Sequence, residues 1–148
     1  MIDVTAEIDA PLEKVWAVLA DGWTYSGWVV GASHVRAVDQ GWPGFGNRVH
    51  HTVGPWPLTL NDTTEVVGVE PGRFIELDAR LWPAGAARVR LDLSRIDEGR
   101  TKVVMSEQVV RGPAKFLPKP VQAALLIPRN RESLSRLADL ASAGVGSR

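Results

Sequence analysis

Cysteine is absent from the 148 residues of the chain. The protein therefore cannot form a disulfide or a thiolate metal site, and it has no cysteine that could act as a nucleophile. This composition suits a reducing compartment, and we expect the protein to be cytoplasmic. The first residues lack the basic and long apolar regions of a signal peptide. No apolar run approaches the ~20 residues that cross a membrane, so no transmembrane segment is expected.

The chain also has no net charge, because its seventeen basic and seventeen acidic side chains cancel. Without a basic patch or a run of like charges, nucleic acid is not an expected partner. The sequence holds no Ser–His–acid spacing and no pair of catalytic carboxylates. Residues 41–46 are rich in glycine but lack the strand-to-helix context of a phosphate-binding loop. We therefore expect no cofactor.

Histidine is scarce, with only His34, His50 and His51. Strand alternation sends His50 and His51 to opposite faces, so they cannot chelate one ion together without a bulge. No metal site is expected. His51 shares its face with Val49 and Val53, and it either lines a cavity or is a hydrogen-bonded histidine at a rim.

The longest helical pattern covers residues 119–141. Steps of four, four, three and four place five residues on one face of this helix: Leu126, Asn130, Leu134, Leu137 and Ala141. Pro128 lies inside the pattern and should end or kink the helix. Two interpretations of Asn130 remain open. It is either a satisfied core amide, or it points into a cavity whose entrance the kink opens.

The preceding segments read mainly as strands. The predicted strands cover residues 1–9, 33–38, 48–53, 58–69, 74–81, 87–94 and 101–110. Short connections, including the turn at Pro71-Gly72, the turn at residues 83–85 and the hairpin at residues 97–99, favour antiparallel pairing. Six strands thus stand between the short helical segments and the long helix.

Two short helical segments are expected after the first strand. Asp9 is predicted to cap the first of them, whose apolar face is formed by Leu12, Val15, Trp16 and Leu19. Residues 23–31 should form one or two helical turns with Trp28 packing inward. The order of elements predicts a single α+β domain over residues 1–141, followed by a tail, residues 142–148, that should fray.

Several motifs together resemble a known family. Residues 8–16 (IDAPLEKVW), Trp28, Pro71-Gly72-Arg73 and residues 129–134 (RNRESL) are similar to the START-like, or SRPBCC, superfamily and in particular to its polyketide cyclase/dehydratase-type members. This resemblance implies a helix-grip fold, in which a seven-stranded antiparallel curved sheet surrounds a long C-terminal helix. It also implies a hydrophobic cavity between sheet and helix, with the short helix and hairpin turns around its mouth.

Glu107 is the leading candidate for chemistry, because strand alternation places it on the inward face of Val103 and Met105. A buried carboxylate needs a partner, and Asn130, Arg129 or Arg131 could supply one. Glu107 is either half-exposed or ion-paired with the helix, or it orients a ligand or acts as a general acid/base. The candidate ligand-binding residues are Trp28, His51, Val89, Leu91, Val103, Met105, Glu107, Leu126, Asn130 and Leu134, and the candidate catalytic residues are Glu107 and His51.

Two further segments leave alternatives open. Either Asp62 or Glu65 faces inward on its strand, because the sequence does not fix the register there. Residues 116–121 are apolar, basic and interrupted by proline. They are either a packed connection, or a lid or a segment that touches a membrane.

The function expected from these features is the binding, or transport, of an apolar small molecule such as a lipid, polyketide or isoprenoid. One alternative is an enzyme of the cyclase or dehydratase kind, in which Glu107 and His51 move protons. Another is a protein-interaction module with a stress-related or toxin-like role. The protein is expected to be a monomer or a homodimer.

Overall fold

The computed structural model describes residues 1–54, 57–81 and 85–144. Its elements, in chain order, are β1 (Ile2–Ile8), α1 (Leu12–Ala20), the 3₁₀ turn η1 (Gly22–Thr24), α2 (Tyr25–Trp28), β2 (Ala32–Val38), β3 (Arg48–Val53), β4 (Leu60–Glu70), β5 (Phe74–Leu81), β6 (Gly85–Asp97), β7 (Arg100–Arg111), the 3₁₀ turn η2 (Pro113–Phe116) and α3 (Lys119–Ser142). Every predicted element is present. The turn predicted at residues 83–85 lies partly outside the described residues, as does the end of the tail.

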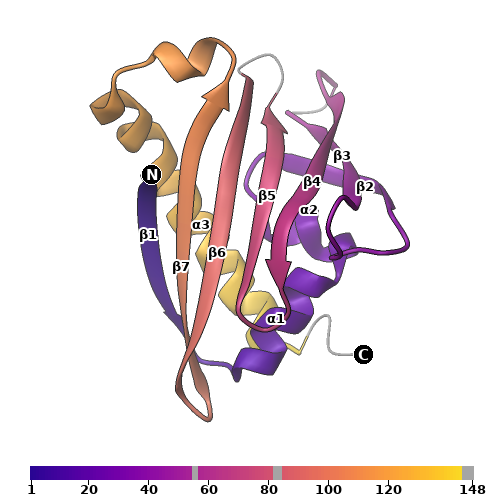
Figure 1. Cartoon of the computed structure of the whole chain (residues 1–148), viewed down its shortest axis with the longest axis vertical. Helices are drawn as coiled ribbons and strands as arrows, with labels where there is room; N and C mark the ends of the chain where they lie inside the picture. The colour runs from indigo at the N-terminus through magenta and orange to yellow at the C-terminus, as the bar shows by residue number, and fades with distance from the viewer. Residues whose placement is uncertain (55–56, 82–84, 145–148) are drawn as a thin grey trace.

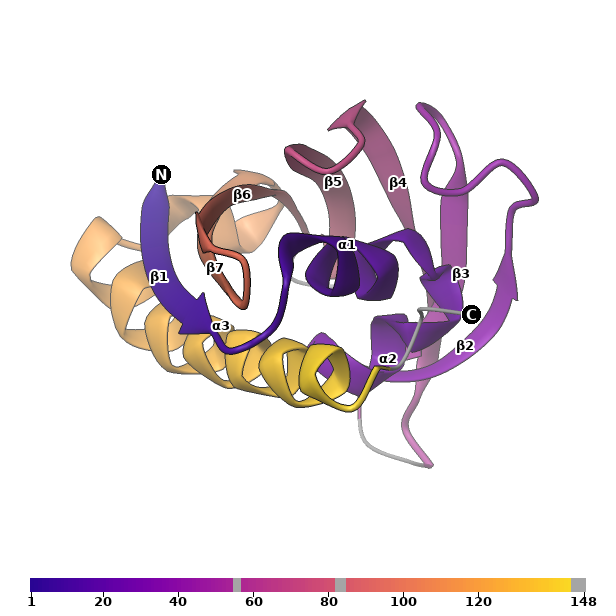
Figure 2. The ribbon, with the colours of Figure 1, turned by 90° about the horizontal axis from the view of Figure 1, so that it is seen from below.

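The seven strands form one antiparallel sheet with the order β1-β7-β6-β5-β4-β3-β2. The sheet curves, and α3 lies across its open side together with α1 and α2 (Figures 1 and 2). This arrangement is the helix-grip fold that the sequence predicts. Within the described part of the chain, no helix combines the length and apolar character needed to cross a membrane.

The core lies between the concave face of the sheet and the helices. Its largest fully buried apolar side chains come from both layers and follow the predicted alternation: Ile8, Val15, Val18, Val49, Val66, Ile75, Leu91, Val103, Leu134 and Leu137. On β4 the inward positions are Asp62, Thr64 and Val66. Asp62 is therefore the inward member of the pair that the sequence left open, whereas Glu65 lies on the outer face.

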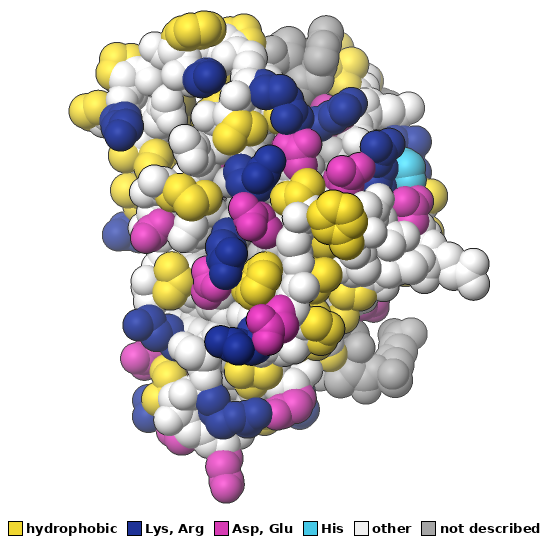
Figure 3. Space-filling model, in the orientation of Figure 1, with side chains coloured by type: hydrophobic (Ala, Val, Ile, Leu, Met, Phe, Trp, Pro, Cys, Tyr) yellow, Lys and Arg dark blue, Asp and Glu magenta, His cyan; other side chains and the backbone are white. Residues whose placement is uncertain are grey.

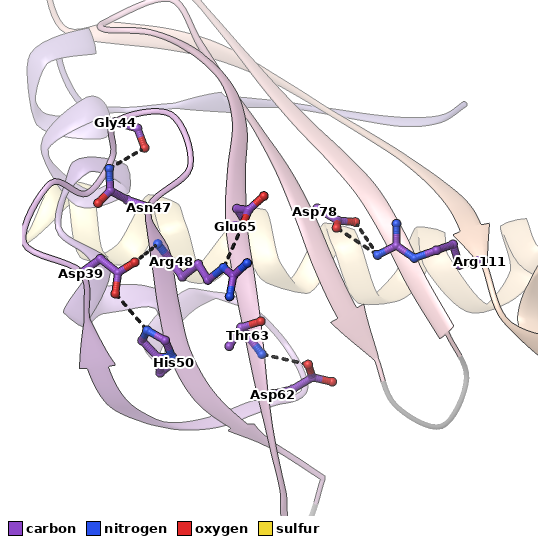
Figure 4. A network of polar contacts seen from close by, with 10 residues as sticks. All are labelled: Asp39, Gly44, Asn47, Arg48, His50, Asp62, Thr63, Glu65, Asp78 and Arg111. Atoms are coloured by element: carbon purple, nitrogen blue, oxygen red, sulfur yellow. Dashed lines mark hydrogen bonds and ion pairs between the residues drawn. The ribbon is translucent and has the colours of Figure 1, made fainter.

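The outer face of the sheet is polar, with basic and acidic side chains interspersed (Figure 3). Arg48 on β3 donates to Glu65 on β4 over 2.8 Å, and Arg111 on β7 donates to Asp78 on β5 over 2.9 Å (Figure 4). Such exposed pairs contribute little to stability individually. They do identify the convex face as the solvated one.

The prediction that Asp9 caps the first helix is wrong. Pro11 occupies the N-cap position, with ψ of 150°, and no side chain caps this end. Thr101 Oγ1 donates to the carbonyl oxygen of Ala10 over 2.8 Å and holds the chain to β7 at that point. The helix therefore begins only after Pro11, too far along the chain for Asp9 to cap it.

Pro128 does not end α3, which continues without interruption from Lys119 to Ser142. The carbonyl that loses its N–H partner to Pro128 belongs to Ala124. Both residues are exposed, so water can satisfy that oxygen. The helix keeps its predicted apolar face, and Asn130 is completely buried on it.

Candidate functional site

A narrow slot separates α3 from the inner face of the sheet. Its lining is mainly apolar and comes from α2, the α2–β2 connection, strands β2, β3, β5, β6 and β7, and α3: Tyr25, Trp28, Val29, Val30, Gly31, Ala32, His51, Val53, Leu77, Ala79, Arg80, Val89, Met105, Glu107, Arg129, Asn130 and Ser133. The cavity volume is about 30 Å³. This is room for about one or two water molecules, and it is far below the roughly 150 Å³ of a cavity that binds benzene.

The most buried charge in the slot is the carboxylate of Glu107, which has no exposed surface. Its strand position opposite Val89 turns the side chain inward. Arg129 Nη2 donates to both carboxylate oxygens, over 2.5 and 2.6 Å, and Asn130 Nδ2 donates to Oε1 over 3.1 Å. Arg131, the third partner considered from the sequence, is exposed. Two successive residues of α3 thus neutralise and satisfy one buried carboxylate.

The second polar group in the slot is a chain of hydrogen bonds through Thr64. Its Oγ1 lies 2.8 Å from the hydroxyl of Tyr25 and 2.9 Å from Nε2 of His51, and the two rings stack at 5.1 Å between centroids. Both hydroxyl hydrogens find an acceptor in this chain only if Tyr25 donates to Thr64 and Thr64 donates to Nε2. The hydrogen of neutral His51 then lies on Nδ1, which is buried without a partner among the described residues.

Burial sets the charge state of both rings. It lowers the pKa of His51 below its ordinary 6.5. The positive charge of Arg36 lowers this pKa further, whereas the negative charge of Asp62 raises it. Burial also raises the pKa of Tyr25 to about 12, although its hydrogen bond with Thr64 acts in the other direction. Both side chains are consequently neutral at pH 7.

We expect the stability of the protein to fall as the pH drops below about 6.5, because the unfolded chain then binds a proton that buried His51 resists. Above that pH the full contribution is present. Urea unfolding curves between pH 5 and 8 (roughly the range in which histidine titrates) measure this slope. His51→Gln should flatten it, and His34→Gln, a change at an exposed histidine, should not. An unchanged slope in His51→Gln would contradict the prediction.

The residues predicted to bind ligand divide into two groups. Trp28, His51, Val89, Met105, Glu107 and Asn130 line the slot. Leu91, Val103, Leu126 and Leu134 are buried beside it and belong to the core. A role in binding stays a prediction for each of them.

Sequence reasoning missed Tyr25, Thr64 and Ser133. Tyr25 is the only tyrosine of the chain and stands one helical turn before Trp28, which is a detectable signal. Thr64 carries no comparable signal, because a threonine in a strand is ordinary. Ser133 lies three residues after Asn130 on the same helical face, so the periodicity of α3 could have indicated it.

One hydrogen bond fastens the mouth of the slot. The backbone N–H of Val30, in the α2–β2 connection, donates to Oγ of Ser133 on α3 over 3.1 Å. Gly31 follows with φ of 101°. Val29, Val30 and Ala32 are only partly buried, so this connection forms the rim of the slot.

A metal centre has no support in the described residues, where no three of His, Cys, Asp or Glu are placed to hold an ion. His50 instead contacts Asp39, with 2.9 Å between Nε2 and Oδ1 (Figure 4). It lies on the opposite side of β3 from His51, as the alternation predicts.

The curved sheet, the long C-terminal helix and the slot between them define a helix-grip protein. The family model described as "Polyketide cyclase / dehydrase and lipid transport" matches residues 1–142, and the chain belongs to that family. No curated protein matches the chain by sequence.

Solved structures confirm the fold at low sequence identity. A protein from Rhodobacter sphaeroides is 20% identical with a TM-score of 0.71, over 97% of this chain and 92% of that one. The structure of Ara h 8.0201 is 14% identical with a TM-score of 0.68, over 95% of this chain and 96% of that one. The di-domain ARO/CYC StfQ from the steffimycin biosynthetic pathway is 16% identical with a TM-score of 0.69, over 95% of this chain and 44% of that one.

Proposed function

We propose that the protein binds an apolar small molecule with one polar group, such as a lipid, a polyketide or an isoprenoid, in the slot between the sheet and α3. The observation that carries this proposal is the placement of Glu107, Arg129 and Asn130 in a slot whose lining is mainly apolar. A purely structural core gains little from a buried ion pair, since hydrophobic side chains of similar volume serve as well or better. Polar groups in an apolar pocket orient a ligand.

In this proposal the structure is the closed form of the protein, because the cavity is too small to hold such a ligand. A ligand larger than a few atoms needs the rim to move away from α3, which breaks the bond between Val30 and Ser133. The backbone N–H of Gly54 also donates to the carbonyl oxygen of Gly31 over 3.3 Å, so the rim stays attached to the end of β3 when it moves away from α3. The guanidinium of Arg129 is also partly exposed and can turn outward with the polar group of a ligand.

Native mass spectrometry of the gently purified protein tests the proposal. We expect a co-purified small molecule that organic extraction releases. Glu107→Gln should keep the fold but lower the affinity for the extracted molecule about tenfold, the effect of one hydrogen bond to a charged group. Glu65→Gln, at a carboxylate on the outer face, should leave the affinity unchanged.

Binding that is the same in Glu107→Gln and the wild type would remove Glu107 from the site. If no small molecule co-purifies and no lipid, polyketide or isoprenoid binds on titration, the binding proposal fails. The interaction-module alternative would then account better for so small a cavity.

Catalysis is the second candidate, and the chain from Tyr25 through Thr64 to His51 favours it. Neutral His51 could accept a proton from a bound polyketide, and Glu107 lies across the same slot. The rate of such an activity would depend on pH, and His51→Gln should abolish this dependence.

A further inference from the structure

Four apolar side chains stand on the surface where η2 meets α3. Phe116 is 85% exposed and Leu125 is 61% exposed. Leu117 and Val121 lie between them in the sequence and are each about 40% exposed. Val121 and Leu125 are one helical turn apart, on the side of α3 away from the sheet. We call these four residues the η2–α3 patch. The segment is therefore not the packed connection that was one of its two interpretations.

The patch is held in a fixed shape. Gln122 Nε2 donates to the carbonyl oxygen of Leu117 over 2.8 Å and lies 3.4 Å from those of Ala114 and Lys115. One side chain of α3 thus hydrogen-bonds to the backbone at the end of η2, mainly at Leu117. Phe116 is presented by an ordered turn.

Charge around the patch has one sign. Residues 108–131 contain five basic side chains and no acidic one, whereas the rest of the chain holds twelve basic and all seventeen acidic side chains. Arg111 and Arg129 are engaged with Asp78 and Glu107. Lys115, Lys119 and Arg131 are exposed and form no ion pair within the described part of the chain.

The patch occupies a corner of the molecule. η2 and the first turns of α3 lie at the upper left in Figure 1, beyond the strands. In the same orientation, Figure 3 shows hydrophobic and basic side chains at this corner, while acidic ones gather over the sheet. On the face that Figure 3 shows, the corner itself carries no acidic side chain.

We propose that the η2–α3 patch docks on an anionic lipid surface, with its apolar side chains in the interfacial region and Lys115, Lys119 and Arg131 against the headgroups. Binding of this kind grows with buried apolar area and with the number of basic residues near the surface. Four apolar side chains are far fewer than the roughly 20–30 residues a side of a stable protein interface. A second copy of the chain is therefore a poorer fit than a bilayer.

Vesicle flotation at low salt tests this docking, and it does not depend on what the slot binds. The probes are vesicles of phosphatidylcholine alone and of phosphatidylcholine with an equal part of phosphatidylserine. We expect the wild-type protein to float with the second kind and to dissociate at about 1 M salt, where the screening length is roughly 3 Å.

Matched variants separate the apolar and the basic contributions. Phe116→Ser/Leu125→Ser should lower vesicle binding more than about tenfold, while Phe45→Ser/Leu58→Ser, at two residues that are 75% and 77% exposed elsewhere, should not. Lys115→Gln/Lys119→Gln should lower it about thirtyfold. The control Lys14→Gln/Lys102→Gln removes two exposed lysines of α1 and β7 and should have a much smaller effect.

Three results would overturn the proposal. The wild-type protein could fail to float with the anionic vesicles, or each control pair could lose as much binding as its counterpart. Light scattering could also show a dimer that Phe116→Ser/Leu125→Ser dissociates, which would assign the patch to a second copy. Each variant should fold, because all eight substituted residues are on the surface. Circular dichroism checks this.

Discussion

Replacing Arg129 by methionine is expected to lower the free energy of unfolding by about 3 kcal/mol at pH 7. The change leaves the carboxylate of Glu107 in the core with Asn130 as the remaining donor of the two, and an uncompensated buried charge costs about 3–5 kcal/mol. Glu107→Gln should cost less, about 1–2 kcal/mol. The difference arises because the Arg129 side chain is 26% exposed and can reach water, whereas that of Glu107 is completely buried.

Urea unfolding measures these values, and two further variants complete the test. Glu107→Leu/Arg129→Met removes both charges together and should recover most of the lost stability. Arg136→Met breaks the exposed pair with Glu132 on the same helix and should cost no more than about 0.5 kcal/mol. If Arg129→Met is as mild as Arg136→Met, the ion pair does not keep Glu107 in the core.

Replacing Gly85 by alanine is expected to cost about 3–5 kcal/mol. A Cβ atom there would lie 1.8 Å from the carbonyl oxygen of Arg111 and 2.8 Å from Cα of Gly112. Both are backbone atoms, and β6 and β7 would have to separate at the end where α3 and η2 are attached. The backbone φ of 126° adds strain for any residue with a side chain.

Gly31→Ala is the matched control for Gly85→Ala. Its φ is also positive, at 101°, but no atom lies within 4 Å of the added Cβ. Only the conformational cost of about 1–2 kcal/mol should therefore appear. Thermal or urea unfolding of the two variants compares them directly. Equal losses would show that backbone conformation, and not the contact with β7, makes Gly85 necessary.

Periodicity in the sequence was sufficient to predict most of the fold. The two-residue period of side chains along a strand predicted that Glu107 lies on the inner face of β7. The spacing of three and four residues along a helix predicted that Asn130 lies on the buried face of α3. These two patterns depend only on the geometry of a strand and of a helix. Because both residues point into the same layer, their meeting was also within reach of the sequence.

Other features of the site depend on distances between segments that no local pattern contains. Arg129 and Arg131 were equal candidates, since the rotation of α3 about its axis decides which one reaches Glu107. The contacts of Thr64 with Tyr25 and His51 join residues 39 and 13 positions apart. The volume of the slot depends on how side chains from α2, five strands and α3 fill it. The resemblance implied a hydrophobic cavity, and a narrow slot was found.

The hydrogen bond that joins the rim to α3, between Val30 and Ser133, has a kinetic consequence for the proposed binding. A guest that cannot enter the resting form must wait for the connection between α2 and β2 to lift. At high concentration the uptake rate then reaches a ceiling set by the protein alone. Release passes through the same opening, so weakening this bond should shorten the residence time of any guest that the slot binds as proposed.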